Sequence, residues 1–325
     1  MRDIKFGLFI LPPDVASAQA TARRAESDGF YSVSHNDHFY SPLGTPQSPQ
    51  LECFTTLTAI AAVTDTIRIV PAVGVANFRT PPLLAKITST LDLASNGRFI
   101  CGLGAGWQGI EYEMHGYEFP PLRVRLEQLE ECIGVLKAMW TQEVPSFKGK
   151  HYSVEKAYNN PRPVQKPHPP FMLGGSGKGL LKIAARHAAI LNIIPPTSNG
   201  RDFVNDPAAT VAFDMATMKQ RIAMLHGFMS DLGRDPQDIE LGGLVLFGLS
   251  KDPADAGLRE MASNLGFPDY ETAQRSPVAL IGTPDEVKRE LEKRIEDTGV
   301  TYYIGLPSSD ESYELLAREV MPAFT

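Results

Sequence analysis

The feature that most constrains the fold of this chain is a regular alternation of short apolar segments with longer amphipathic ones. Short apolar runs rich in β-branched residues predict buried strands, and apolar residues at steps of three and four predict helices. Eight strands are expected, over residues 4–10, 31–34, 67–75, 99–103, 171–173, 190–194, 239–249 and 300–306. The alternating helices are expected over residues 15–28, 53–63, 82–94, 123–140, 178–188, 215–232, 284–299 and 310–320.

This order of elements predicts the fold class. Parallel strands need a crossover connection, usually a helix, between one strand and the next. The eight units indicate an α/β fold, a (β/α)8 barrel formed by residues 1–325 as a single domain, more than an open doubly wound sheet. Polar stretches at 38–52, 141–169 and 195–212 show no clear regular pattern, and we interpret them as loop insertions.

Charge and cysteine content exclude several classes of protein. The chain has 38 acidic residues against 31 Lys and Arg, a net charge of −7, whereas binding to nucleic acid or to a membrane surface needs cations. No apolar run approaches the ~18 residues that cross a bilayer. Three widely spaced cysteines predict neither a disulfide framework nor a paired-cysteine metal site, so we expect a cytoplasmic protein.

In such a barrel the functional residues lie at the carboxyl ends of the strands. Residues 174–179 place four glycines, a serine and Lys178 between a strand and a helix. Glycines let the backbone approach a ligand, and the free amides at a helix start bind anions, so the segment predicts a phosphate site. Its ligands would be Gly174, Gly175, Ser176 and Gly177. A plain strand-to-helix turn is the alternative.

Two further strand ends carry candidate chemistry. His35, Asp37 and His38 could bind a metal, exchange protons with a ligand, or cap a turn. Alternation along the strand turns His38 away from the other two, which disfavours a metal site formed by all three. Trp107 follows a glycine-rich turn, where it could stack on a flat ring or form a hydrophobic lid.

Taken in order, several segments resemble the luciferase-like flavin-dependent oxidoreductases, most closely the branch that is assigned to the deazaflavin coenzyme F420. The resemblance runs from residue 1 to about 305. Its segments are Met1–Gly7, Asn36–His38, Asn77–Pro81, Leu91–Arg98, Gly102–Trp107, Glu111–Tyr112, Arg125–Glu127, Pro161–Gln165, Pro169–Gly175 and Ile281–Glu286. Each segment alone is common, but their shared order is specific.

The resemblance implies a TIM barrel with loop insertions whose mouth holds a tricyclic cofactor ring. It implies a bulge after the third strand, with a non-proline cis peptide among Val73, Gly74 and Val75, that presses on the ring. The implied catalytic residues are His38, Asp37 and Trp107. The implied cofactor-binding residues are Asp37, Val73, Gly74, Val75, Asn77, Gly106, Gly174, Gly175, Ser176 and Gly177, and no metal is implied.

From the resemblance we expect an oxidoreductase that transfers a hydride between F420 and a small organic substrate. The alternative is a monooxygenase that uses reduced FMN from a separate cofactor reductase, and a flavin-storing protein and a metal-dependent hydrolase remain further possibilities. We expect a homodimer. Trp107 stands where the family's sugar-phosphate dehydrogenases carry an acidic residue, so a flatter or more apolar substrate is expected.

Six cationic side chains could bind the oligoglutamate tail of F420 near Gly177, or they could form a solvated surface. They are Lys148, Lys150, Arg162, Lys166, Lys178 and Lys182.

Overall fold

The computed structural model describes residues 4–41, 45–197 and 207–324, so Met1–Asp3 lie outside the described residues. One sheet contains β1 (Lys5–Phe9), β2 (Ser32–His35), β3 (Arg68–Pro71), β4 (Gly74–Val75), β5 (Cys101–Gly104), β8 (Phe171–Gly174), β9 (Ile190–Ile193), β10 (Glu240–Leu249), β11 (Ala279–Gly282) and β12 (Tyr302–Pro307). Neighbouring strands are parallel in the order β3-β2-β1-β12-β10-β9-β8-β5-β4, with β11 paired to β10. A parallel bridge between Ile69 and Phe99 nearly closes the barrel, which confirms the predicted fold class.

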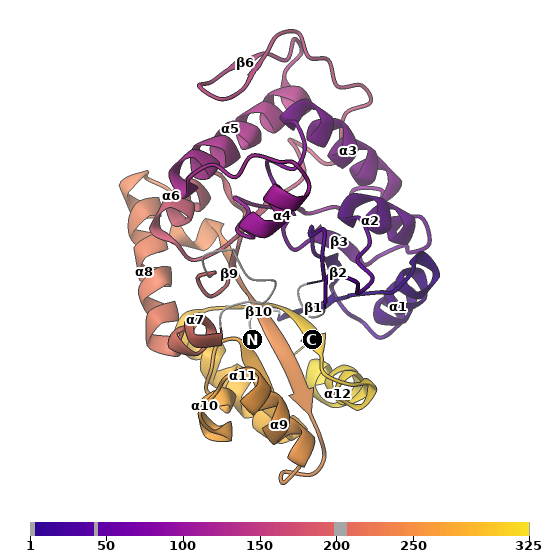
Figure 1. Ribbon diagram of the computed structural model, residues 1–325, viewed down its shortest axis with the longest axis vertical. Helices are drawn as coiled ribbons and strands as arrows, with labels where there is room; N and C mark the ends of the chain where they lie inside the picture. Colours follow the sequence, from indigo (N-terminus) through magenta and orange to yellow (C-terminus); the bar gives the residue numbers. More distant parts are fainter. Residues whose placement is uncertain (1–3, 42–44, 198–206, 325) are drawn as a thin grey trace.

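Helices accompany the strands, and most of them cover the outside of this sheet. They are α1 (Val15–Ser27), α2 (Cys53–Ala61), α3 (Pro81–Ala94), α4 (Gly109–Met114), α5 (Leu122–Thr141), α6 (Lys178–His187), α7 (Pro207–Ala212), α8 (Met215–Asp231), α9 (Ala256–Asn264), α10 (Tyr270–Gln274), α11 (Pro284–Thr298) and α12 (Asp310–Leu315). Figure 1 shows α1, α2, α3, α5, α6 and α8 around the strands, with α4 inside this ring in projection. Within the described ranges, no helix is both long and apolar enough to cross a membrane.

The prediction of a single strand over residues 67–75 is wrong, because this segment forms the two short strands β3 and β4. β3 pairs with β2, whereas β4 pairs with β5 on the other side. The chain therefore changes partners between Pro71 and Gly74. A run of β-branched and apolar residues indicates an extended backbone, but it carries no information about which neighbour the backbone bonds.

Two of the three stretches expected to lack regular structure contain some. The stretch 141–169 holds the antiparallel hairpin of β6 (Phe147–Lys148) and β7 (Ser153–Val154), and α7 lies in the described part of 195–212. The short elements α4, α9, α10 and β11 were also not expected. Each spans nine residues or fewer, too short for a periodic pattern to stand out.

The side chains inside the barrel form a small core of their own. Phe9, Val70, Ile100, Met172, Ile190, Tyr302 and Ile304 pack together there, separate from the larger core between sheet and helices. The strand ends approach closely just above this core. A Cβ on Gly102 would lie 1.9 Å from the carbonyl oxygen of Pro71, so β5 accepts only glycine at this position.

We expect Gly102→Ala to lower the free energy of unfolding by about 3 kcal/mol or more, since the methyl group meets backbone that cannot rotate away. Gly227→Ala is the control, because Gly227 lies within α8 with nothing near its Cβ position. That change should stabilise the protein by about 0.5–1 kcal/mol. Urea denaturation measures both, and a Gly102→Ala protein as stable as the wild type would refute the close approach.

Candidate active site

The side chain of Val73 packs across the ends of two paired strands. A Cβ on Gly104, at the end of β5, would lie 2.9 Å from a Val73 methyl group, and one on Gly174, at the end of β8, would lie 3.0 Å from both methyl groups. Val73 is only half-buried and lies above the barrel core. The result is an apolar surface at the barrel mouth.

A non-proline cis peptide joins Ala72 to Val73. From the sequence, this cis peptide was expected among Val73, Gly74 and Val75. The bond is the one that precedes Val73, the first of these residues. Gly74 and Val75 instead form β4, opposite Leu103 and Gly104.

Asp37, in the loop after β2, holds the bulge formed by Ala72–Val75 in place. Its carboxylate accepts from the backbone N–H of Val75 at 2.8 Å and from both terminal nitrogens of Arg79 at 2.8 and 2.9 Å. Burial disfavours the charge of Arg79, but Asp37 and Glu52 outweigh this and raise the pKa of Arg79 above its usual value. These bonds engage both carboxylate oxygens, so the geometry assigns Asp37 to holding the bulge in place.

His38 contacts two groups that determine its orientation. Its Nδ1 lies 2.8 Å from Oε2 of Glu111, whose side chain is 1% exposed. The other carboxylate oxygen of Glu111 accepts from the backbone N–H groups of Phe39 and Tyr40, at 2.8 and 3.1 Å. The Trp107 ring meets the imidazole edge-on, with 5.8 Å between centroids. Within the described part of the chain, Nε2 of His38 has no hydrogen-bond partner.

Tyr112 orients the amide of Asn77. Its hydroxyl donates to Oδ1 of Asn77 at 2.7 Å, and burial raises the pKa of Tyr112, so the proton needed for this bond stays in place. Oδ1 is thereby occupied, and the Nδ2 amide of Asn77 remains as the donor. Gly106 has φ +73°, and a Cβ there would lie 2.0 Å from the Tyr112 hydroxyl, so glycine is needed for packing whether or not it touches a ligand.

The glycine loop after β8 leads into α6 without a side-chain cap. Gly177 is the N-cap residue, is exposed, and has no atom within 4 Å of its Cβ position. Gly175 has φ +141°, and a Cβ there would strike Leu180, so this turn also requires glycine. Ser176 is buried. The first amides of α6 are therefore open to an anion.

Of the six cations expected near Gly177, only Lys178 and Lys182 belong to α6. Lys150 instead binds Glu127 of α5, with 2.8 Å between Nζ and Oε2. Arg162 donates to backbone carbonyls at the end of α5. Closeness in sequence therefore does not bring Lys150 and Arg162 to the glycine loop. The β6–β7 hairpin turns Lys150 toward α5, and Arg162 contacts the end of α5.

His35 is a structural residue. It is buried, with Nδ1 2.9 Å from the Ile10 carbonyl oxygen, and with Nε2 3.2 Å from the Leu51 carbonyl oxygen and 3.4 Å from the amide nitrogen of Gln50. It cannot join His38 in a metal site while both nitrogens are used. Across residues 4–41, 45–197 and 207–324, no group of three His, Cys, Asp or Glu side chains could hold a metal ion.

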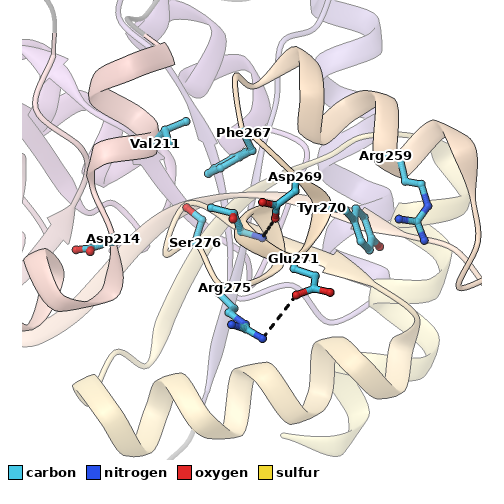
Figure 2. A pocket seen from close by; sticks show the side chains of 10 residues that line it. Val211, Asp214, Arg259, Phe267, Asp269, Tyr270, Glu271, Arg275 and Ser276 are labelled. Atoms are coloured by element: carbon cyan, nitrogen blue, oxygen red, sulfur yellow. Dashed lines mark hydrogen bonds and ion pairs between the residues drawn. The ribbon is translucent and has the colours of Figure 1, made fainter.

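A cavity of about 630 Å³ is lined by none of these residues. Figure 2 shows the side chains that line it. It is lined from α7, the start of α8, α9 and α10, with Phe267, Tyr270 and Arg275 among its residues. Both cations that line it have partners, since Arg259 lies over the Tyr270 ring and Arg275 pairs with Glu271. None of the predicted site residues lines this cavity.

Comparison with known proteins identifies the family. A family model described as luciferase-like monooxygenase matches residues 5–277. The chain belongs to this family. The match confirms the resemblance inferred from the sequence and makes the protein an enzyme of the luciferase-like oxidoreductase family, which has relatives that depend on F420 and relatives that depend on FMN.

Three relatives show the range of the family. An uncharacterized protein of Mycobacterium tuberculosis is 34% identical over 188 residues, 53% of this chain and 65% of that protein. An F420-dependent glucose-6-phosphate dehydrogenase of Amycolatopsis mediterranei is 33% identical over 166 residues, 51% and 49% of the two chains. An FMNH(2)-dependent dimethylsulfone monooxygenase of Pseudomonas putida is 30% identical over 173 residues, 53% and 47%. The chain thus spans less than two thirds of each relative's length.

Two solved structures share the fold over nearly the whole chain. An F420-dependent secondary alcohol dehydrogenase, in complex with an F420-acetone adduct, has a TM-score of 0.80 at 21% identity and covers 99% of each chain. The coenzyme F420 dependent tetrahydromethanopterin reductase from Methanopyrus kandleri has a TM-score of 0.78 at 20% identity, covering 99% of this chain and 100% of that one. At such identities the likeness shows the luciferase-like barrel alone.

Three residues at this family site were not singled out from the sequence. From the sequence, no role was assigned to Glu111 and Arg79, which occur only within the segments that resemble the family. None was assigned to Asn192, which occurs only within an expected strand. Asn192 is buried, its Oδ1 has no partner among the described residues, and alternation places it on the inner side of β9 with Ile190. A lone polar residue in an apolar strand was the available indication.

We expect Asp37→Asn to lower the free energy of unfolding by about 3–5 kcal/mol, because it leaves the Arg79 guanidinium, 13% exposed, without its buried counter-charge. Glu52→Gln is the matched control. Glu52 is 48% exposed and also caps α2, so its loss should cost only about 1–2 kcal/mol. Chemical denaturation compares the two variants, and equal costs would contradict the role assigned to Asp37.

Proposed function

We propose that this enzyme transfers a hydride between coenzyme F420 and a small organic substrate. The observation that carries the proposal is the placement of His38 and Trp107 together, with Nε2 of His38 left without a partner among the described residues. Transfer of a hydride to or from a carbon that bears oxygen requires a proton at that oxygen, and an oriented imidazole is suited to exchange it.

The residues present fit the cofactor in two respects. The Val73 side chain packs over Gly104 and Gly174 and is partly exposed, so it offers an apolar support for one face of the ring. The uncapped start of α6 at Gly177, with Lys178 beside it, suits the phosphate of the cofactor tail. Asn77 would offer its amide donor to a carbonyl at the ring edge, and Asp37 would keep the bulge under the ring.

When bound, F420 supplies a carbon that accepts or gives up a hydride. The protein would orient the substrate with Trp107, exclude water with the aromatic side chains around α4, and exchange the substrate's oxygen-bound proton at Nε2 of His38. Those aromatic side chains are Phe39, Phe78, Tyr112, Tyr117 and Phe119, which lie in mutual contact. This lining favours a neutral, flat or apolar substrate.

The alternative is a monooxygenase that uses reduced FMN and oxygen, favoured by the similarity to the FMNH(2)-dependent dimethylsulfone monooxygenase. Such an enzyme would need a separate reductase as partner. With either cofactor we propose a cytoplasmic homodimer that binds a small-molecule substrate and neither nucleic acid nor membrane.

A binding titration with F420 and with FMN tests the cofactor. We expect F420 to quench tryptophan fluorescence and to bind at least about tenfold more tightly than FMN, a difference of about 1.4 kcal/mol. Trp107→Phe is the control, because it should abolish the quenching while Trp140, buried in the core, keeps its emission. Preference for FMN would support the monooxygenase, and binding of neither cofactor would overturn both functions.

Gly177→Asp tests the phosphate site without disturbing the fold. Aspartate is a favoured N-cap residue and has open space at this position, so stability should be unchanged or slightly higher. Its carboxylate would occupy the α6 amides and repel the phosphate, so the preferred cofactor should bind at least about tenfold more weakly. Gly177→Ala should bind nearly as the wild type does, and equal weakening in both variants would count against the site.

A further inference from the structure

We propose that Glu111 is a positioning residue that fixes His38 as the Nδ1–H tautomer, so that Nε2 meets the substrate as a proton acceptor. The inference rests on the proposed function for its consequence in turnover, but its structural content does not depend on any cofactor. It assigns a direction of proton transfer to the enzyme when the His38 imidazole is neutral, namely removal of a proton from a hydroxyl group of the substrate.

The tautomer follows from the hydrogen bonds of one buried carboxylate. Oε1 of Glu111 accepts from the backbone N–H groups of Phe39 and Tyr40. Oε2 lies 2.8 Å from Nδ1 of His38. An ionised carboxylate has only acceptors, so Nδ1 must donate the proton in this contact. In the neutral imidazole the lone pair then lies on Nε2.

The arrangement has little freedom to rearrange. Glu111 is 1% exposed, against 14% for the His38 side chain, so water does not compete for the carboxylate. Both backbone donors belong to the two residues that directly follow His38, so one carboxylate holds the imidazole and the main chain next to it. The edge-on contact with Trp107 restricts the imidazole on another side.

The resulting step would balance for a substrate that carries a C–H and an O–H on one carbon. F420 would supply the acceptor for the C–H electron pair as hydride, Nε2 of His38 would take the hydroxyl proton, and the O–H electron pair would form the carbonyl bond. His38 becomes an imidazolium whose Nδ1–H still faces the Glu111 carboxylate. The substrate class assigned is therefore an alcohol that is oxidised to a carbonyl compound.

Glu111→Gln should invert this arrangement with little change of shape. The two backbone N–H groups still require an oxygen, so the amide oxygen stays opposite Phe39 and Tyr40. The amide nitrogen then replaces Oε2 and donates to Nδ1, which moves the imidazole proton to Nε2. Where a carboxylate orients a catalytic histidine, this type of change lowers turnover by about 10⁴-fold through the wrong tautomer.

Nitrogen-15 NMR of histidine-labelled protein without cofactor tests the inference directly. The chain has seven histidines, and the signals of His38 are those lost in His38→Asn. At a pH where the imidazole is neutral, we expect a protonated Nδ1 in the wild type and in Glu113→Gln, a control on the exposed side of α4. We expect a protonated Nε2 in Glu111→Gln.

A wild type with the proton on Nε2, or a Glu111→Gln variant with an unchanged tautomer, would overturn the inference. The wild-type spectrum alone decides if Glu111→Gln does not fold. In F420-dependent oxidation of alcohols, Glu111→Gln should lower kcat by roughly 10²–10⁴-fold with KM little changed, and Glu113→Gln should not. If the tautomers are as expected but the wild type oxidises no alcohol, the assignment of an alcohol substrate fails and the role of Glu111 in orienting His38 stands; if the wild type also binds no F420, the proposed function fails as well.

Discussion

The candidate site depends on a buried carboxylate that binds backbone and cation at once. Asp37 follows β2, yet its partners are the N–H of Val75 in β4 and the guanidinium of Arg79. In this way the loop after one strand determines where the backbone after another strand lies. The bulge at Val73, the β4–β5 pairing and the apolar surface at the mouth all lie within reach of this contact.

A second carboxylate repeats this arrangement across the mouth. Glu111 in α4 binds two backbone amides and the imidazole of His38, as Asp37 binds one amide and a guanidinium. Asp37 and His38 are adjacent in the chain, so the loop after β2 is held from both sides, by the bulge and by α4. The two holding groups and the proposed proton-exchanging group therefore belong to one connected network.

The sequence predicts the barrel well because most of its strands and its long helices carry their own periodic pattern. The capping box at Thr283 and the left-handed Gly299 are local features of this kind. The change of strand partner at Ala72 and Val73 could not be predicted, because an extended backbone looks alike in either pairing. Glu111 was missed as a functional residue for a similar reason: its role depends on contacts with residues 38–40, more than seventy positions away. Resemblance pointed to His38, Asp37 and Trp107 as catalytic residues, but it could not tell a carboxylate that positions its neighbours from one that reacts.

The surface formed by Val73 consists of three residues that complement one another in size. The methyl groups of Val73 occupy the space that side chains at positions 104 and 174 would otherwise fill. These residues come from the bulge and from two different strands, so a side chain at position 104 or 174 is tolerated only if the residue at position 73 becomes smaller. A single substitution that adds a side chain at position 104 or 174 is therefore not accommodated, whereas no such restraint from Val73 acts on Trp107. Diversification of the barrel mouth should thus proceed through residues outside this surface, while Gly104 and Gly174 resist change.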